Sequence, residues 1–319
     1  MNVRRRLIPA AAAVAATALG AGTLAGCSGD SVAVTNTDKF DVVASFYPMR
    51  FLAEQIGGSH VHVTSLTSPG QEPHDLELSP RQIAQLEVSD AVLYLKNLQP
   101  SVDEAVAQSP VATKIDAASL TTLESHGTEA GGHTAADDGH EDEGAGGKDP
   151  HIWLDPVRYA QVAQGVGDAF AEADPKHAAD YRKNTAKLVG KLDALNFAFR
   201  QDLAHTRTKV FITTHAAFGY LAERYGLTEE AVNGLDPESE PSAARIRDLE
   251  RTARAEGVTT VFYETLVSDR TAKTVAHDAG LRTDVLDPVE GITDRSRGDD
   301  YFSVQEANLK ALKRALGAK

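Results

Sequence analysis

The sequence predicts an α/β protein with two parallel-sheet lobes joined by one long connecting helix. Short apolar runs typical of buried strands alternate with helical segments in two separate series. Alternation of this kind predicts a parallel sheet for each series. A long stretch with helical periodicity separates the two series, and it has the length to connect two lobes.

The first 26 residues are predicted to be a lipoprotein signal peptide. Three arginines at 4–6 precede a short, Ala-rich apolar run, which ends in Leu-Ala-Gly before Cys27. This ending resembles the lipobox of bacterial lipoproteins, which implies cleavage before Cys27 and acylation of its sulfur. An ordinary signal peptide with an incidental cysteine is the alternative. Residues 27–38 are small and polar, and we interpret them as a tether.

Residues 39–155 are predicted to form the N-terminal α/β lobe. Apolar or alternating runs predict strands at 41–45, 60–64 and 91–95, and helical spacing predicts helices at 49–56 and 80–87.

Within this lobe, residues 124–148 are rich in Gly, Asp and Glu and almost lack apolar side chains. Such a segment cannot bury enough surface to offset its ordering entropy, so we predict a disordered loop. The loop contains His126, His133 and His140, which we predict to be an auxiliary, weak metal-binding group.

Residues 156–206 are predicted to be a helical region, with the long linking helix at 175–205. Residues 207–319 are predicted to form the C-terminal α/β lobe. Its predicted strands and helices alternate, with strands at 210–213, 258–263 and 283–286 and helices at 216–225, 242–256, 269–279 and 300–316.

The chain is acidic, with a formal net charge of −14 over 319 residues. Removal of residues 1–26 takes away three arginines and no acidic residue, which leaves −17. Phosphates would be repelled by this charge, so we exclude nucleic acid as a partner. The charge suits cations and an extracytoplasmic surface.

Candidate ligands occur where predicted strands pass into loops or helices. His74 and His151 lie in proline-containing loops, His215 directly follows a strand, and Asp287 follows the last strand. Open α/β sheets bind ligands beyond the C-terminal ends of their strands. Imidazole and carboxylate groups are suitable ligands for zinc. Each histidine taken singly is more often structural, but together they favour a metal site.

Three motifs carry a resemblance to a known family. They are Pro-Gly-Gln-Glu-Pro-His-Asp at 69–75, Asp-Pro-His-Ile-Trp-Leu-Asp-Pro at 149–156 and His-Ala-Ala-Phe-Gly-Tyr-Leu at 215–221. In this order, they resemble the metal-binding lipoproteins of ABC importers for zinc and manganese, the cluster A-I solute-binding proteins. After the first motif the family often has Glu-Pro, whereas this chain has Glu77-Leu78.

The resemblance implies two lobes with the metal in the cleft between them. It implies the ligands His74, His151, His215 and Asp287, with Asp294 as a possible substitute for Asp287. A third imidazole at His215 favours zinc over manganese, because manganese members tend to have a carboxylate there. Glu264 ends a strand near the expected cleft, and we predict that it orients a ligating imidazole, although a plain structural hydrogen bond is the alternative.

The resemblance further implies a binding protein, not an enzyme, that delivers Zn²⁺ to an ABC permease. We expect a monomer that is exported and held by a lipid on Cys27 at the outer face of the cell membrane. A manganese-type binder, a surface adhesin and a zinc buffer remain open as alternatives. A secreted zinc hydrolase is a rival class, but it needs an open metal position and a general base, and the sequence has no His-Glu-x-x-His motif.

Overall fold

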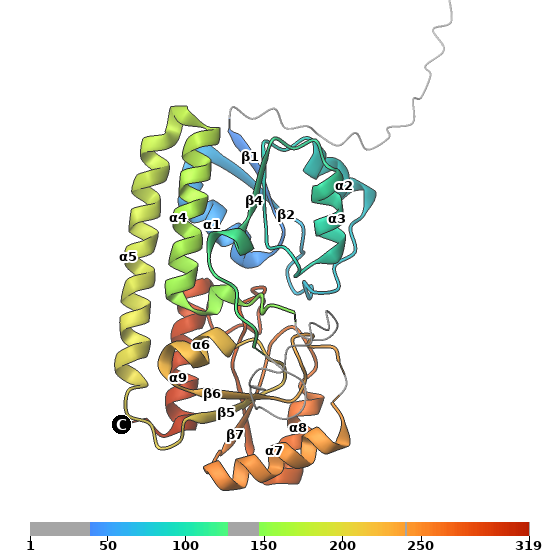
Figure 1. The fold of residues 1–319 in the computed structure, drawn as a ribbon, viewed down its shortest axis with the longest axis vertical. Helices are drawn as coiled ribbons and strands as arrows, with labels where there is room; N and C mark the ends of the chain where they lie inside the picture. Colours follow the sequence, from blue (N-terminus) through green and yellow to red (C-terminus); the bar gives the residue numbers. More distant parts are fainter. Residues whose placement is uncertain (1–38, 127–146, 240, 319) are drawn as a thin grey trace, which may run out of the picture. The chain divides into compact units, whose positions relative to one another are not determined.

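The computed structural model describes residues 39–126, 147–239 and 241–318, which contain two four-stranded sheets (Figure 1). Every strand pair within each sheet is parallel. The strand orders are β2-β1-β3-β4 and β6-β5-β7-β8, so the two sheets have the same topology. The predicted fold class is confirmed.

The first sheet and its helices lie within residues 40–116. The strands are β1 (Phe40–Ala44), β2 (Val61–Ser65), β3 (Ala91–Tyr94) and β4 (Thr113–Asp116), and the helices are α1 (Tyr47–Gly57), α2 (Pro80–Glu87) and α3 (Pro100–Gln108). A reciprocal capping box between Ser79 and Gln82 starts α2, and Pro80 occupies its first turn. The sequence did not predict α3 or β4. The edge strand β4 reads Thr-Lys-Ile-Asp, with one apolar residue, and its pairing with β3 makes it a strand.

The second sheet and its helices lie within residues 210–316. The strands are β5 (Val210–Thr213), β6 (Thr228–Ala231), β7 (Thr260–Tyr263) and β8 (Arg282–Val285), and the helices are α6 (Gly219–Tyr225), α7 (Ala243–Glu256), α8 (Arg270–Ala279) and α9 (Tyr301–Leu316). The sequence missed β6, whose residues Thr-Glu-Glu-Ala lack a strand pattern and are held at the edge by β5.

Two long helices form a hairpin beside both sheets (Figure 1). They are α4 (Pro156–Ala173) and α5 (Ala178–Asp202), separated by a short 3₁₀ turn at Pro175–His177. The predicted linking helix therefore begins later and is shorter than expected, because Asp174 accepts hydrogen bonds from Tyr181 and His177 and closes the turn. The 25 residues of α5 extend over about 37 Å, enough to contact α1 and α9.

Residues 153–155, just before α4, connect the two sheets through buried polar contacts. The indole of Trp153 is fully buried, and its Nε1 donates to the Pro288 carbonyl at 2.7 Å. Tyr301 donates to the Trp153 carbonyl at 2.6 Å. Arg224 donates to both oxygens of buried Asp155, with its Nη2 at 2.6 Å. These bonds fix the loops that carry the candidate ligands.

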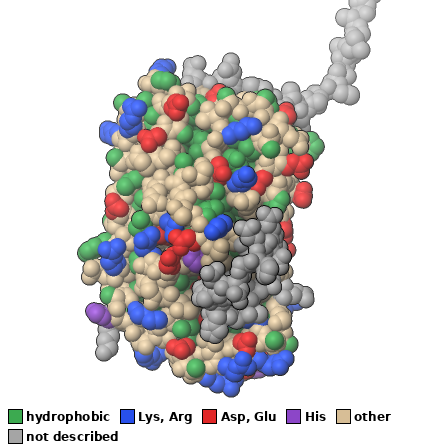
Figure 2. Space-filling view, in the orientation of Figure 1, with side chains coloured by type: hydrophobic (Ala, Val, Ile, Leu, Met, Phe, Trp, Pro, Cys, Tyr) green, Lys and Arg blue, Asp and Glu red, His purple; other side chains and the backbone are tan. Residues whose placement is uncertain are grey.

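Within the described ranges, no helix is both long and apolar enough to cross a membrane. The predicted signal peptide, Cys27 and the tether lie in residues 1–38, outside the described residues. Over most of the face drawn in Figure 2, acidic and basic side chains are interspersed.

Candidate metal centre

Three histidines and one glutamate converge where the loops of the two sheets meet. His74, His151, His215 and Glu290 each offer one ligand atom, and these atoms all lie within 4.8 Å of one another. The Oε1 of Glu290 is 3.3 Å from His74 Nε2, 3.4 Å from His151 Nε2 and 3.8 Å from His215 Nε2. The carboxylate oxygen is thus close to all three imidazole nitrogens.

Three of these residues lie in loops that follow the C-terminal ends of parallel strands. His74 lies in the loop after β2, His215 comes two residues after β5, and Glu290 lies in the loop after β8. His151 lies in the segment that leads into α4. Because the carboxyl ends of parallel strands point to the same edge, both sheets direct their loops toward one site.

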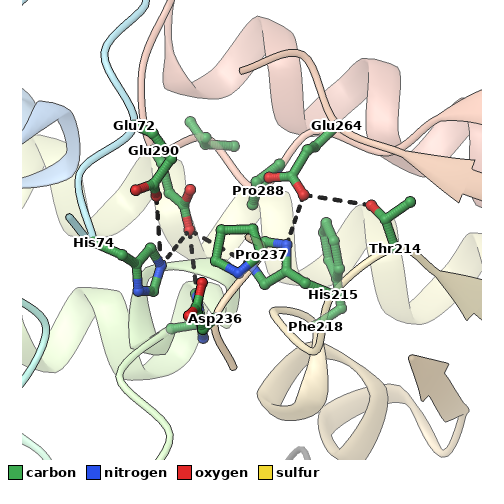
Figure 3. A network of polar contacts seen from close by, with 12 residues as sticks. Glu72, His74, Thr214, His215, Phe218, Asp236, Pro237, Glu264, Pro288 and Glu290 are labelled. Atoms are coloured by element: carbon green, nitrogen blue, oxygen red, sulfur yellow. Dashed lines mark hydrogen bonds and ion pairs between the residues drawn. The ribbon is translucent and has the colours of Figure 1, made fainter. Parts of the chain in front are cut away.

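Buried carboxylates hold two of the imidazoles in place. His151 Nδ1 lies 2.8 Å from Asp149 Oδ1, and His215 Nδ1 lies 2.7 Å from Glu264 Oε1. Both carboxylates are buried, and Figure 3 shows Glu264 between His215 and Thr214. With Nδ1 occupied in each ring, Nε2 is left to face the centre of the cluster.

The buried charges shift the acid–base equilibria of the cluster. Burial opposes protonation of His151, but its contacts with Asp149 and Glu290 outweigh burial and raise the pKa of His151 to about 10. Burial likewise opposes protonation of His215, and Glu264 outweighs it, so the pKa of His215 is raised. Burial would raise the pKa of Glu290, but the surrounding imidazoles hold it well below its usual range.

The distances from Glu290 to the three imidazoles fit the ligand spacing around a tetrahedral zinc ion. Zinc–nitrogen and zinc–oxygen bonds of about 2.0–2.1 Å place neighbouring ligand atoms about 3.4 Å apart. The separations from Glu290 Oε1 to the three Nε2 atoms, 3.3–3.8 Å, are close to this value. Among the described residues, Nε2 of His151 and of His215 and Oε2 of Glu290 are buried without a hydrogen-bond partner. A bound cation would satisfy such atoms.

The structure places Glu290, and not Asp287, with the three histidines. Both oxygens of Asp287 are occupied, one by the Thr265 hydroxyl at 2.9 Å and the other by the Val289 amide at 2.8 Å. Burial raises the pKa of Asp287 to about 6. Asp294, the possible substitute, is exposed and lies outside the cluster.

An unusual turn explains why Glu290 reaches the centre. Val289 has φ of 59°, a left-handed conformation that is unfavourable for a β-branched residue. Asp287 stabilises this turn by accepting from the Val289 amide. The turn redirects the chain so that the next side chain enters the cluster. Sequence reasoning missed Glu290, although a second carboxylate three residues after Asp287 was a visible signal.

Of the predicted auxiliary histidines, the structure describes only His126. Its Nδ1 lies 2.9 Å from Asp149 Oδ2, so it shares this carboxylate with His151. His126, Glu124 and Glu223 could hold a cation, but Arg158 pairs with both glutamates and already offsets their charge. Glu124–His126 were expected in the disordered loop, and these contacts fix them instead. His133 and His140 lie outside the described residues.

Comparison with known proteins points to one family. The family model described as "Zinc-uptake complex component A periplasmic" matches residues 42–315. The zinc-binding lipoprotein AdcA of Streptococcus pneumoniae is 34% identical over 281 residues, which cover 86% of this chain and 55% of AdcA. The chain thus spans about half the length of this relative. The high-affinity zinc uptake system protein ZnuA of Bacillus subtilis is 31% identical, covering 88% of this chain and 89% of ZnuA.

Solved structures give the same result. The Zn(II)-bound ZnuA-like domain of Streptococcus pneumoniae AdcA superposes with a TM-score of 0.72 at 32% identity, covering 87% of this chain and 99% of that domain. The laminin-binding protein Lmb of Streptococcus agalactiae, described as having adhesin and metal-transporting activity, gives a TM-score of 0.75 at 26% identity, covering 87% and 99%.

Proposed function

The chain belongs to the family of component A of zinc-uptake complexes, and from this premise we propose that it captures Zn²⁺ and delivers it to an ABC permease. The observation that carries the proposal is the convergence of His74, His151, His215 and Glu290, whose ligand atoms all lie within 4.8 Å of one another. Three imidazoles and one carboxylate suit zinc better than manganese, which prefers oxygen ligands.

The donor set also bears on whether the protein is an enzyme. A catalytic zinc site keeps a coordination position open for water, whereas four protein ligands close it. The family consists of binding components of transporters. We therefore infer a carrier that binds and releases the ion without turning over a substrate.

Metal analysis tests the capture step. The purified protein is stripped with a chelator, titrated with zinc or manganese, and analysed for bound metal. We expect one tightly bound zinc at the four-donor site and a much weaker affinity for manganese. His151→Ala and His215→Ala should each abolish tight binding. Unchanged zinc affinity in both variants would refute the site.

Delivery and location need separate tests. We infer that a lipid on Cys27 holds the protein at the outer face of the cell membrane, since the related AdcA of Streptococcus pneumoniae is a zinc-binding lipoprotein. We also infer that the protein is a monomer. Cys27→Ser should move the protein from the membrane fraction to the medium or the soluble fraction. Light scattering measures the mass of the purified chain. Co-purification with the membrane permease distinguishes an importer component from a free zinc buffer.

The likeness to Lmb supports adhesion as a second candidate function. Immobilised laminin provides the direct assay, with zinc-loaded and stripped protein compared. Binding that saturates would support adhesion, and binding no greater than that of serum albumin would refute it.

A further inference from the structure

Glu72 lies at the exposed side of the cluster, next to the most accessible of the four candidate ligands. The side chains of His74 and Glu72 are 12% and 13% exposed, whereas those of His151, His215 and Glu290 are at most 2% exposed. Among the four candidate ligands, His74 is thus the one most accessible to an ion from solvent, and Glu72 lies beside it.

The carboxylate of Glu72 has one oxygen free for a ligand. Its Oε2 accepts from the Asp75 amide at 3.2 Å. Its Oε1 is buried and, in the part of the chain that the structure describes, has no hydrogen-bond partner. This Oε1 lies 4.0 Å from His74 Nε2, and Figure 3 shows the carboxylate directed toward His74 and Glu290. Burial of a carboxylate oxygen without a partner is energetically unfavourable unless a cation or a hydrogen-bond donor binds it.

His74 therefore stands between two carboxylates of different accessibility. Its Nε2 is 3.3 Å from Glu290 Oε1, which is inside the cluster, and 4.0 Å from Glu72 Oε1, which is at its edge. Glu72 does not belong to the group of four whose ligand atoms all lie within 4.8 Å of one another. It is placed to contact an ion on its way in, but not to complete the final tetrahedron.

We propose that Glu72 and His74 take the incoming divalent cation first and pass it to the four-donor set. The inference rests on the proposed function and adds a residue for the capture step. The negative charge of Glu72 attracts the hydrated ion, and a carboxylate oxygen of Glu72 replaces one of its water ligands. His74 keeps hold of the ion as Glu290 replaces Glu72.

The test compares Glu72→Gln with Asp75→Asn in the full chain. Glutamine keeps the side-chain volume and the acceptor for the Asp75 amide, but removes the charge. Asp75 is exposed, carries the same charge and lies in the same loop, so it controls for general electrostatic attraction. Stopped-flow mixing with zinc at low and high salt measures association, and chelator competition measures the equilibrium Kd.

We expect Glu72→Gln to slow zinc association about tenfold at low salt, since one nearby charge acts on a divalent ion. High salt should reduce this difference. The Kd should change no more than about threefold, because dissociation by the same route slows in parallel. Asp75→Asn should associate within about twofold of the wild type.

Two results would overturn the inference while leaving zinc binding intact. One is an association rate for Glu72→Gln equal to that of Asp75→Asn. The other is a loss of equilibrium affinity in Glu72→Gln as large as in Glu290→Gln, which would make Glu72 a permanent ligand. If wild-type protein bound no zinc, the proposed function itself would fall, and this inference with it.

Discussion

Replacement of Glu290 by glutamine separates the ligand set in the structure from the set that the sequence suggested. Glu290 is fully buried, and its Oε1 is within 3.8 Å of three imidazole nitrogens. Glutamine keeps the shape but removes the only carboxylate from the four-donor group. The matched control is Asp287→Asn, because Asp287 is also buried and lies three residues away.

The expected loss of zinc affinity in Glu290→Gln can be worked out from the contribution of one ligand among four. A four-ligand structural zinc site contributes roughly 10–16 kcal/mol, so one ligand accounts for about 3 kcal/mol, or about a hundredfold in Kd. At saturating zinc, a hundredfold weaker Kd removes about 2.7 kcal/mol of metal-induced stabilisation. For a chain of this size, the zinc-induced rise in Tm should shrink by roughly 4–5 °C.

Asp287→Asn should behave differently. It weakens the hydrogen bonds to Thr265 and to the Val289 turn, at a cost of about 1–3 kcal/mol in both the stripped and the loaded protein. Its zinc-induced rise in Tm should therefore remain close to that of the wild type. Thermal melting by circular dichroism, with and without zinc, gives both quantities. Loss of the zinc-induced rise in Asp287→Asn, with the rise retained in Glu290→Gln, would refute the assignment.

Three further predictions concern pH, metal choice and the His-rich loop. The apparent zinc affinity should fall at least about tenfold per unit as pH drops from about 8 to 6, because zinc must displace the proton that His151 holds with its raised pKa of about 10; a pH-independent affinity in buffered chelator competition would contradict this. His215→Glu should narrow the preference for zinc over manganese. The effect should be larger in combination with Glu264→Gln, because Glu264 lies 2.7 Å from His215 Nδ1 and would repel a second carboxylate. Equal zinc and manganese affinities in the wild type would refute the reasoning. Deletion of residues 127–146 should remove weak zinc sites from a calorimetric titration and leave the tight site intact, and loss of the tight site would disprove this separation.

The contacts of His151 with Asp149 and Glu290 also make the stability of the metal-free protein depend on pH. The pKa of His151 is raised in the fold, so its contribution to the free energy of unfolding is fully present below the ordinary histidine pKa of about 6.5. That contribution is lost as pH rises from about 6.5 through about 10. Zinc binding, by contrast, becomes stronger as pH rises, because it requires the deprotonated imidazole of His151.

The sequence by itself determined the two-series α/β architecture and the positions of the three histidines along it. Local patterns suffice for this, because apolar runs, helical spacing and caps such as Ser79 before α2 act within a few residues. Since parallel strands end at one edge, residues such as His74 and His215 could be placed near a ligand site before any contact was known. The edge strands β4 and β6 were not predicted from the sequence, because their polar residues form strands only by pairing with a neighbouring strand.

Only the tertiary structure decided which carboxylate joins the histidines. Asp287 and Glu290 both follow β8, and the sequence favoured Asp287 because it directly follows the predicted strand and because the family resemblance implied it. The choice depends on the left-handed turn at Val289, which the packing around it maintains against the preference of a β-branched residue. The docking of His126 on Asp149 also depends on long-range contacts. Such choices are made by side chains distant in sequence, and a pattern read along the chain carries no information about them.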